Sequence, residues 1–315
     1  MSDDTSLQIP FPHRRSPHGQ RATELHRDWL IRHPLLPDAD HPGYAHWEVV
    51  DLAALGYPDA GPDELALAAD LMGFYFLFDD QFDGPLGRRP AEVAPICERL
   101  IAVLHGARPD QGSPVETAFA DLWNRSVQGM PARWQARAAY NWEYYLASHP
   151  AEAAGRISTR PPDRDGYLEL RRGTAAMETI FDMVERLGQF EVPAAVLHHP
   201  VLRQLRQLAA DIPSLSNDVR SYPLEAPRGD VNNLVMIVQR ERRCSAEEAC
   251  AVVIAEAQLM VDRCAELRDR LPDVHRELGL SRIEGTIAQR YADGLLTWLA
   301  GYLSWEARTG RYQTV

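Results

Sequence analysis

The sequence predicts an all-α fold, built as one domain within a chain of 315 residues. Apolar residues recur at three- and four-residue spacing along most of the chain, which is the period of an amphipathic helix. Clusters of proline and glycine separate the periodic stretches, and no stretch shows the strict alternation typical of a β-strand. Two domains would be usual at this length, but no change of composition marks a boundary, so we expect one helical core.

The chain begins with a polar, proline-rich segment at residues 1–20, which we expect to be a flexible strap before a helical domain of residues 21–315. His13, Arg14 and Arg15 in this strap either fold over the mouth of a site or remain in solvent.

Ten helices are predicted within the domain from the apolar period. They are expected at residues 21–33, 64–83, 91–105, 115–128, 131–148, 165–190, 198–222, 231–241, 245–270 and 283–307. The breaks between them coincide with Pro/Gly clusters, of which the clearest are at residues 56–63, 105–114, 160–166 and 226–230.

The helix predicted at 64–83 carries the most informative segment, LMGFYFLFDDQFD at residues 71–83. Its bulky apolar side chains belong in a protein interior, and they run directly into carboxylates. Asp79 and Asp83 share one face of a helix, where they repel each other beside an apolar wall unless a cation lies between them. Mg²⁺ is typically held by one or two carboxylates together with substrate phosphates. The segment therefore predicts a metal-diphosphate site, with a solvated helix end as the structural alternative.

A second polar motif, NDVRSYPLE, lies at residues 217–225. Asn217, Ser221 and Glu225 follow each other at four-residue spacing, so they form one stripe of a helix. All three offer oxygen donors, which suit a second Mg²⁺, although a polar helix face would look the same. Pro223 cannot donate to the carbonyl four residues before it, so we expect the helix to bend or end near Glu225.

Together, the two motifs resemble the DDxxD and N-D-x-x-S-x-x-x-E motifs of bacterial class I terpene synthases (terpene cyclases) of the pentalenene-synthase type. The resemblance extends from IPFP at residues 9–12 to the closing RY. It implies a single-domain helical bundle around a central active-site cavity. It also implies that three Mg²⁺ ions bind with the substrate diphosphate between the motifs, and that their ligands are Asp79, Asp83, Asn217, Ser221 and Glu225.

The same resemblance implies a set of diphosphate donors. Arg171, 46 residues before Asn217, occupies the position of the diphosphate-sensing arginine, and Arg228 follows the second motif. Arg311 and Tyr312 form the RY pair. Guanidinium groups suit this role because they bind phosphate oxygens in a planar fork and remain charged.

One departure from the family lies just after the sensing arginine. Thr174 and Ala175 stand where the family often has a linker residue and then a glycine whose carbonyl faces the reacting carbon. We expect Ala175 to present its carbonyl in the same way. Without glycine, the sequence shows no obvious break within the predicted helix at 165–190.

Aromatic residues are expected to line the apolar part of the cavity. Tyr75 and Phe76 precede the aspartates, and Trp305 belongs to an apolar stripe of the helix predicted at 283–307. A carbocation needs stabilisation by groups that do not quench it, and aromatic faces attract cations. For any single ring, packing in the core is the alternative role.

The net charge of −12 and the pI near 5.4 argue against nucleic acid as a partner. An anionic substrate remains compatible, because bound Mg²⁺ reverses the local charge. The four cysteines, Cys97, Cys244, Cys250 and Cys264, lack the spacing of a zinc site or CxxC motif and are expected to be reduced thiols. No signal peptide and no 18-residue apolar run is present, so we expect a cytoplasmic protein without membrane insertion, and a homodimer is conceivable.

The expected function is Mg²⁺-dependent cyclisation of a linear prenyl diphosphate to a terpene hydrocarbon or alcohol, with release of diphosphate. Farnesyl diphosphate is the expected substrate, with geranylgeranyl diphosphate as the alternative. An isoprenyl diphosphate synthase would carry a second aspartate-rich motif where NDVRSYPLE stands. A non-catalytic helical interaction protein would not need the arginines in addition to both motifs.

Overall fold

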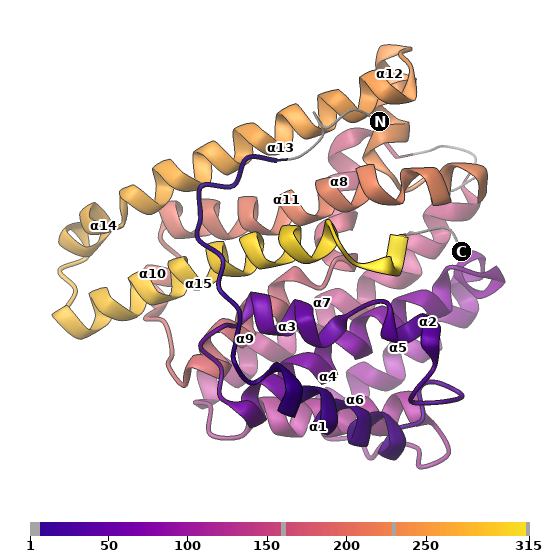
Figure 1. Cartoon of the computed structure of the whole chain (residues 1–315), viewed down its shortest axis with the longest axis horizontal. Coiled ribbons are helices and arrows are strands. Elements are labelled where there is room, and N and C mark those ends of the chain that lie inside the picture. The colour runs from indigo at the N-terminus through magenta and orange to yellow at the C-terminus, as the bar shows by residue number, and fades with distance from the viewer. Residues whose placement is uncertain (1–6, 159–161, 229–230, 313–315) are drawn as a thin grey trace.

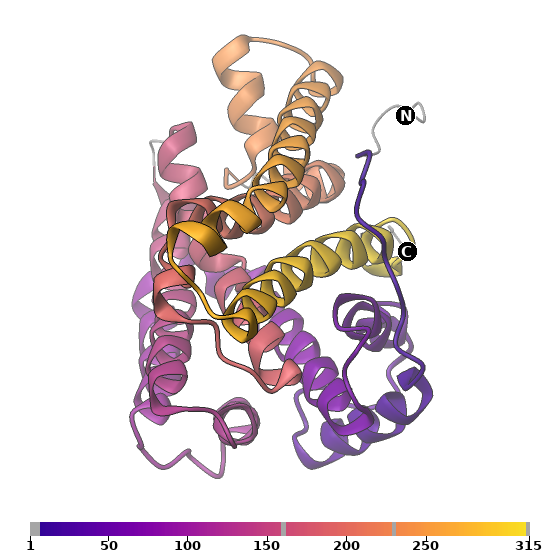
Figure 2. The same ribbon diagram turned by 90° about the vertical axis from the view of Figure 1, so that its left-hand side faces the viewer.

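The computed structural model describes residues 7–158, 162–228 and 231–312, and every regular element in these ranges is a helix. The all-α fold predicted from the apolar period is therefore confirmed. Helices of very different sequence position lie side by side around the centre of the molecule (Figures 1 and 2).

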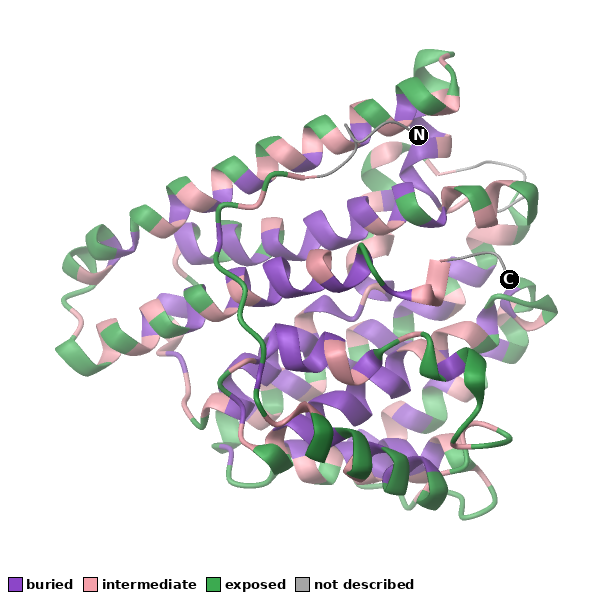
Figure 3. Cartoon of the chain, in the orientation of Figure 1, coloured by how far each residue is buried: buried purple, intermediate pink, exposed green. Residues whose placement is uncertain are grey.

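Four helices form the centre of the bundle. They are α3 (Val49–Gly56), α4 (Pro62–Asp79), α11 (Pro200–Glu225) and α15 (Arg282–Glu306). Most of their residues are buried (Figure 3), because α3 packs on both α4 and α15, and α11 packs on α15. A helix that is apolar around most of its circumference must be covered on most sides, and the remaining helices provide this cover.

The remaining helices surround these four. In chain order they are α1 (Gly19–Arg32), α2 (Pro42–Ala45), α5 (Pro90–Leu104), α6 (Pro114–Val127), α7 (Ala132–Ile157), α8 (Arg164–Thr174), α9 (Met177–Gly188), α10 (Ala194–Leu197), α12 (Leu234–Arg242), α13 (Ala246–Asp269) and α14 (Leu271–Glu277). Ser245 and Ser281 begin α13 and α15 with capping boxes, each closed by a glutamate three residues later. These caps satisfy backbone N–H groups that have no partner inside the helix.

The aspartate-rich segment is only partly helical. The helix predicted at 64–83 begins at Pro62 and ends at Asp79, and a 3₁₀ turn, η2 (Asp80–Phe82), follows it. The chain then folds back tightly, since a side chain at Gly87 would lie 1.7 Å from the carbonyl oxygen of Phe82. Asp83 therefore lies beyond the helix and not on one α-helical face with Asp79.

The prediction of one continuous helix at 165–190 is also wrong, because two helices occupy these residues. α8 ends at Thr174, and Ala176 adopts left-handed backbone angles of φ 56° and ψ 10° before α9 begins at Met177. The Thr179 hydroxyl donates to the carbonyl oxygen of Ala176 at 2.7 Å, which stabilises the break. An L-residue with these left-handed angles costs roughly 1–2 kcal/mol. The apolar period of the sequence did not predict this break.

The other helix ends agree with the prediction to different degrees. α11 continues through Pro213 and ends at Glu225, near the position expected from Pro223. α7 continues through Pro150 to Ile157, nine residues beyond the predicted end, and α3 was not predicted at all.

The N-terminal segment from residue 7 runs without regular structure across the outside of the bundle, from α13 towards α1 (Figure 1). Phe11 is 4% exposed, and Arg14 and Arg15 form ion pairs with Asp59 and Asp51. His13, Arg14 and Arg15 do not line the cavity described below. The first six residues lie outside the described ranges.

Candidate active site

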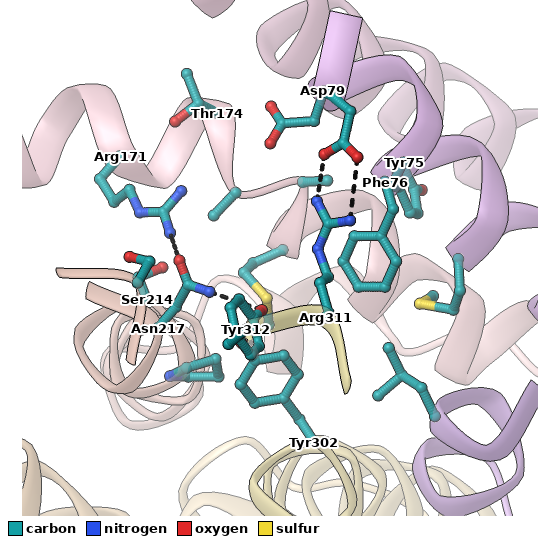
Figure 4. A pocket seen from close by; sticks show the side chains of 18 of the residues that line it. Tyr75, Phe76, Asp79, Arg171, Thr174, Ser214, Asn217, Tyr302, Arg311 and Tyr312 are labelled. Atoms are coloured by element: carbon teal, nitrogen blue, oxygen red, sulfur yellow. Dashed lines mark hydrogen bonds and ion pairs between the residues drawn. The ribbon is translucent and has the colours of Figure 1, made fainter. Parts of the chain in front are cut away.

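A cavity of about 310 Å³ opens between the C-terminal end of α4, the break between α8 and α9, and the helices α11 and α15 (Figure 4). Both sequence motifs lie at its mouth. Of the residues predicted for the site, the cavity is lined by Tyr75, Phe76, Asp79, Asp83, Arg171, Thr174, Ala175, Asn217, Ser221, Glu225, Arg228, Arg311 and Tyr312. The structure thus brings together thirteen of the fourteen predicted residues.

Trp305 is the residue that the structure places elsewhere. It is fully buried, and its indole N–H donates to the carbonyl oxygen of Trp47 at 2.8 Å. Its ring stacks behind Phe76, with centroids 5.5 Å apart and planes at 12°. Phe76 therefore lies between Trp305 and the cavity. Helical position alone predicted the correct side of α15 but not this intervening ring.

One wall of the mouth is acidic. Burial, and then the carboxylates of Glu152, Asp83 and Asp80, raise the pKa of Asp79 well above its ordinary value. Partial desolvation at the mouth, and then the Asp80 carboxylate, also raise the pKa of Asp83. The Asp83 carboxylate lies 3.8 Å from Arg228, with both side chains more than half exposed. Crowded carboxylates of this kind favour either protonation or a bound cation.

The arginine of the RY pair lies against this acidic wall. The Arg311 guanidinium donates to the two carboxylate oxygens of Asp80 at 2.5 and 3.3 Å. It also lies 4.4 Å from the ring centroids of both Trp47 and Phe76, whose planes are nearly perpendicular to each other. The planar group is thus held by charge on one side and by aromatic rings on the others, a geometry that lysine cannot reproduce.

The opposite wall comes from α11. Asn217 accepts a hydrogen bond from Arg171 at 2.7 Å through its side-chain oxygen, and it donates to the Tyr312 hydroxyl at 2.8 Å (Figure 4). Arg171 also lies 3.5 Å from a carboxylate oxygen of Asp218. The oxygen that would serve as a metal ligand is therefore held by a guanidinium group.

One turn further along α11 lies Ser221, which is 6% exposed, and then Glu225. Burial, and then the charge of Asp218, raise the pKa of Glu225 to about 7, although Asn233 donates a hydrogen bond to its carboxylate at 2.9 Å. Glu225 remains within α11 despite Pro223. Asn217, Ser221 and Glu225 therefore keep the helical stripe that their spacing predicted.

The donors of the two motifs fit a hard divalent cation, because all of them are oxygen atoms. Among the described residues, no group of three or more His, Cys, Asp or Glu side chains converges on one point that could hold a metal by itself. The acidic wall and the α11 wall face each other across the mouth. Such an arrangement suits ions whose coordination is completed by substrate phosphates and water.

The deeper wall of the cavity is apolar and aromatic. It includes Tyr75, whose hydroxyl lies 2.7 Å from that of Thr179, and Trp298, whose ring stacks on Tyr302 at 5.3 Å. Thr174 is 6% exposed, and its hydroxyl has no hydrogen-bond partner among the described atoms. Further members of this wall include Leu52, Met72, Tyr145, Met177 and Ile180.

Several lining residues were not predicted. Asp80 is the middle member of the aspartate-rich motif, and its proximity to Arg311 depends on the 3₁₀ turn. Trp47 lies in a segment between α2 and α3 for which the sequence offered no signal. Trp298 and Tyr302 belong to the same stripe of α15 as Trp305, so the sequence identified the face but selected the wrong ring on it.

Comparisons with known proteins agree with this arrangement. The sequence model of terpene synthase family 2, described as C-terminal metal binding, matches residues 70–263, which include both motifs. The chain belongs to this family of terpene synthases. It is accordingly an enzyme, and the recognition made from the two motifs is confirmed.

The terpene synthase has relatives along almost its whole length. It is 35% identical to pentalenene synthase from Streptomyces arenae, over 99% of this chain and 94% of the relative. It is 36% identical to (−)-β-caryophyllene synthase ((2E,6E)-farnesyl diphosphate cyclizing) from Saccharothrix espanaensis, over 98% and 88%. The crystal structure of germacradien-4-ol synthase from Streptomyces citricolor is 60% identical and covers 98% of this chain and 100% of that one, with a TM-score of 0.91.

The described part of the terpene synthase contains no helix that is long and apolar enough to span a membrane.

Proposed function

We propose that this terpene synthase uses Mg²⁺ to ionise a linear prenyl diphosphate, farnesyl diphosphate first, and cyclises the resulting carbocation to a terpene hydrocarbon or alcohol while diphosphate is released. The observation that carries the proposal is the pairing of an oxygen-donor mouth with an aromatic cavity. The mouth combines Asp79 and Asn217 on facing walls with Arg171 beside Asn217 and Arg311 beside Asp80.

The arginines and the phenol at the mouth bind the diphosphate in this proposal. Arg171 and Arg311 exchange Asn217 and Asp80 for phosphate oxygens, to which guanidinium groups bind strongly. Tyr312 and Arg228 add donors at the same end. Three Mg²⁺ ions, held by Asp79, Asp83, Asn217, Ser221 and Glu225, would supply Lewis-acid stabilisation of the leaving diphosphate.

The deeper wall acts on the hydrocarbon. Tyr75, Phe76 and Trp298 offer aromatic faces to the allylic cation, and none of these faces is a nucleophile that would end the cascade early. The apolar contour folds the chain so that its double bonds lie close to the cation. Ala175, at the break between α8 and α9, places backbone near the reacting carbon.

The size of the cavity favours the shorter substrate. Its volume of about 310 Å³ lies at the lower end of the range of roughly 300–1,000 Å³ found for ligand pockets. The Saccharothrix relative carries farnesyl diphosphate in its name. We therefore place farnesyl (C15) before geranylgeranyl (C20) diphosphate.

The test is incubation of the purified protein with C10, C15, C20 and C25 prenyl diphosphates, each with Mg²⁺ or with EDTA, followed by analysis of volatile products and released diphosphate. We expect a cyclic product from the C15 substrate, with Mg²⁺ only. Turnover in EDTA would contradict the metal assignment. A longer linear diphosphate, formed only when isopentenyl diphosphate is added, would instead show an elongating synthase.

A further inference from the structure

A buried carboxylate lies behind the deeper wall of the cavity. Glu306, in the last turn of α15, is 3% exposed. Its carboxylate accepts hydrogen bonds from the Ser216 hydroxyl on α11 and from the Tyr302 hydroxyl at 2.9 Å. No basic side chain in the described ranges forms an ion pair with it. A buried carboxylate held only by hydroxyl groups is costly, so its position invites a functional explanation.

Tyr302 connects this carboxylate to the cavity. Tyr302 is 8% exposed and is part of the lining (Figure 4), and its ring stacks on that of Trp298. A phenol has one O–H donor and two acceptor lone pairs, and here the donor is committed to Glu306. Tyr312, which accepts from Asn217, interacts with the same hydroxyl. One acceptor lone pair of the Tyr302 oxygen is therefore left without a partner among the described residues, and the residue itself lines the cavity.

The other phenols of the lining are different. The Tyr75 hydroxyl is engaged by Thr179, which itself donates to the carbonyl oxygen of Ala176. Tyr145 has no hydrogen bond to a carboxylate within the described part of the chain. The carboxylates that do line the cavity belong to the metal-diphosphate mouth. Tyr302 is thus the lining group that combines an available oxygen with a carboxylate that can take its proton.

We propose that Tyr302, backed by Glu306, accepts the proton that ends the cation cascade, an inference that rests on the cyclisation proposed above. A C–H bond next to the cationic carbon breaks, and its electron pair becomes the new C=C bond. The proton passes to the Tyr302 oxygen while the proton of Tyr302 passes to Glu306. Where water adds to the cation first, the same pair takes the proton from the bound water, and the product is an alcohol.

The protonation behaviour of Glu306 supports this role. Burial raises its pKa to about 7, whereas the hydrogen bonds from Ser216 and Tyr302 lower it. A carboxylate with a pKa near the working pH both accepts a proton and releases it again before the next cycle. Other groups that act on it are Arg220 and Asp218 on α11 and, through Tyr302, Tyr312.

The experiment compares Tyr302→Phe, Glu306→Gln and Glu306→Asp with wild type, using farnesyl diphosphate and Mg²⁺. Released diphosphate and the product distribution are measured on the same samples, and circular dichroism checks the fold. We expect diphosphate release within about threefold of wild type in all variants, because ionisation occurs before the proton is lost. The main product should fall about tenfold in Tyr302→Phe and Glu306→Gln, and Glu306→Asp should restore part of it.

Tyr57→Phe is the matched control, since it removes a buried phenol hydroxyl that donates to the carbonyl oxygen of Ile180 and does not line the cavity. Its product ratios should remain close to wild type. Reactions in ¹⁸O-labelled water show which products carry water oxygen. A loss confined to unlabelled olefins identifies the proton as one from carbon, and a loss confined to labelled alcohols identifies it as one from water.

Unchanged product ratios in folded Tyr302→Phe and Glu306→Gln would overturn the inference. So would a collapse of diphosphate release with unchanged products, which would assign both residues to the mouth. If Tyr302→Phe does not fold, the isosteric variant Glu306→Gln provides the test. Its product ratio should stay constant between pH 6 and 8, whereas the product ratio of wild type should change. Absence of diphosphate release from wild type would instead contradict the proposed function.

Discussion

At the scale of single residues, the mouth is built from polar groups that already engage each other. Arg171 engages Asn217, and Arg311 engages Asp80. Removing one member of such a pair leaves the other buried and uncompensated, so its effect is larger than that of a surface substitution. Both pairs must open for metal and diphosphate to bind in the proposed way.

Asp79→Ala and Asn217→Ala should each lower kcat/KM by at least about 10²-fold, or roughly 2.7 kcal/mol. Each removes a proposed metal ligand but little packing. Gln81→Ala is the control, because Gln81 is exposed within the same motif. Steady-state kinetics and circular dichroism check this prediction. Near wild-type kinetics in both variants would show that the motifs are structural.

Phe76 and Trp305 should behave differently although their rings stack. Phe76→Leu removes an aromatic face from the cavity, and a cation–π contribution of about 1 kcal/mol corresponds to a roughly fivefold change in product ratio. Trp305→Phe should lower the melting temperature and change the product ratio less, because Trp305 lies behind Phe76. A greater effect of Trp305→Phe on products would mean that the wall is arranged otherwise.

At the scale of helices, the apolar period located most elements but not the features that shape the site. The turn after Asp79 and the break at Ala176 are accompanied by short-range contacts, namely Gly87 against Phe82 and Thr179 against Ala176. Neither contact follows from local periodicity. The stripe of Asn217, Ser221 and Glu225 was predictable from its four-residue spacing. It is kept because α11 continues through Pro213 and Pro223.

Ala176 gives a direct test of the break. Ala176→Gly should change the free energy of unfolding by no more than about 1 kcal/mol, because relief at positive φ is offset by greater entropy of the unfolded chain. Ala176→Val should be clearly destabilising, since a β-branched residue is strongly disfavoured at φ 56°. Denaturant unfolding of both variants measures this. Equal stability of the valine variant would show that the helix is continuous.

At the scale of the whole molecule, buried carboxylates should make stability fall as pH rises from 6.5 to 8. Burial raises the pKa of Glu225 and of Glu306 to about 7, and it raises the pKa of Asp182. A carboxyl group with a raised pKa keeps its proton in the folded state, whereas the unfolded chain has already lost it, so stability is lost as pH passes through the folded-state pKa.

Groups with lowered pKa values do not offset this trend. Glu116 and Asp59 are ionised in both states throughout this window, and the lowered pKa values of His33 and His149 make stability rise with pH mainly below the ordinary histidine value. Thermal unfolding in metal-free buffer is the measurement. A melting temperature that increases from pH 6.5 to 8 would contradict the assigned burial.

The central claim is that metal and diphosphate bind together between the two motifs. Calorimetric titration of the protein with inorganic diphosphate, in Mg²⁺ and in EDTA, tests it most directly. The account predicts strong binding in Mg²⁺ and loss of at least about tenfold in affinity both in EDTA and in Asn217→Ala. Equally strong binding in EDTA and Mg²⁺, unchanged in Asn217→Ala, would contradict it.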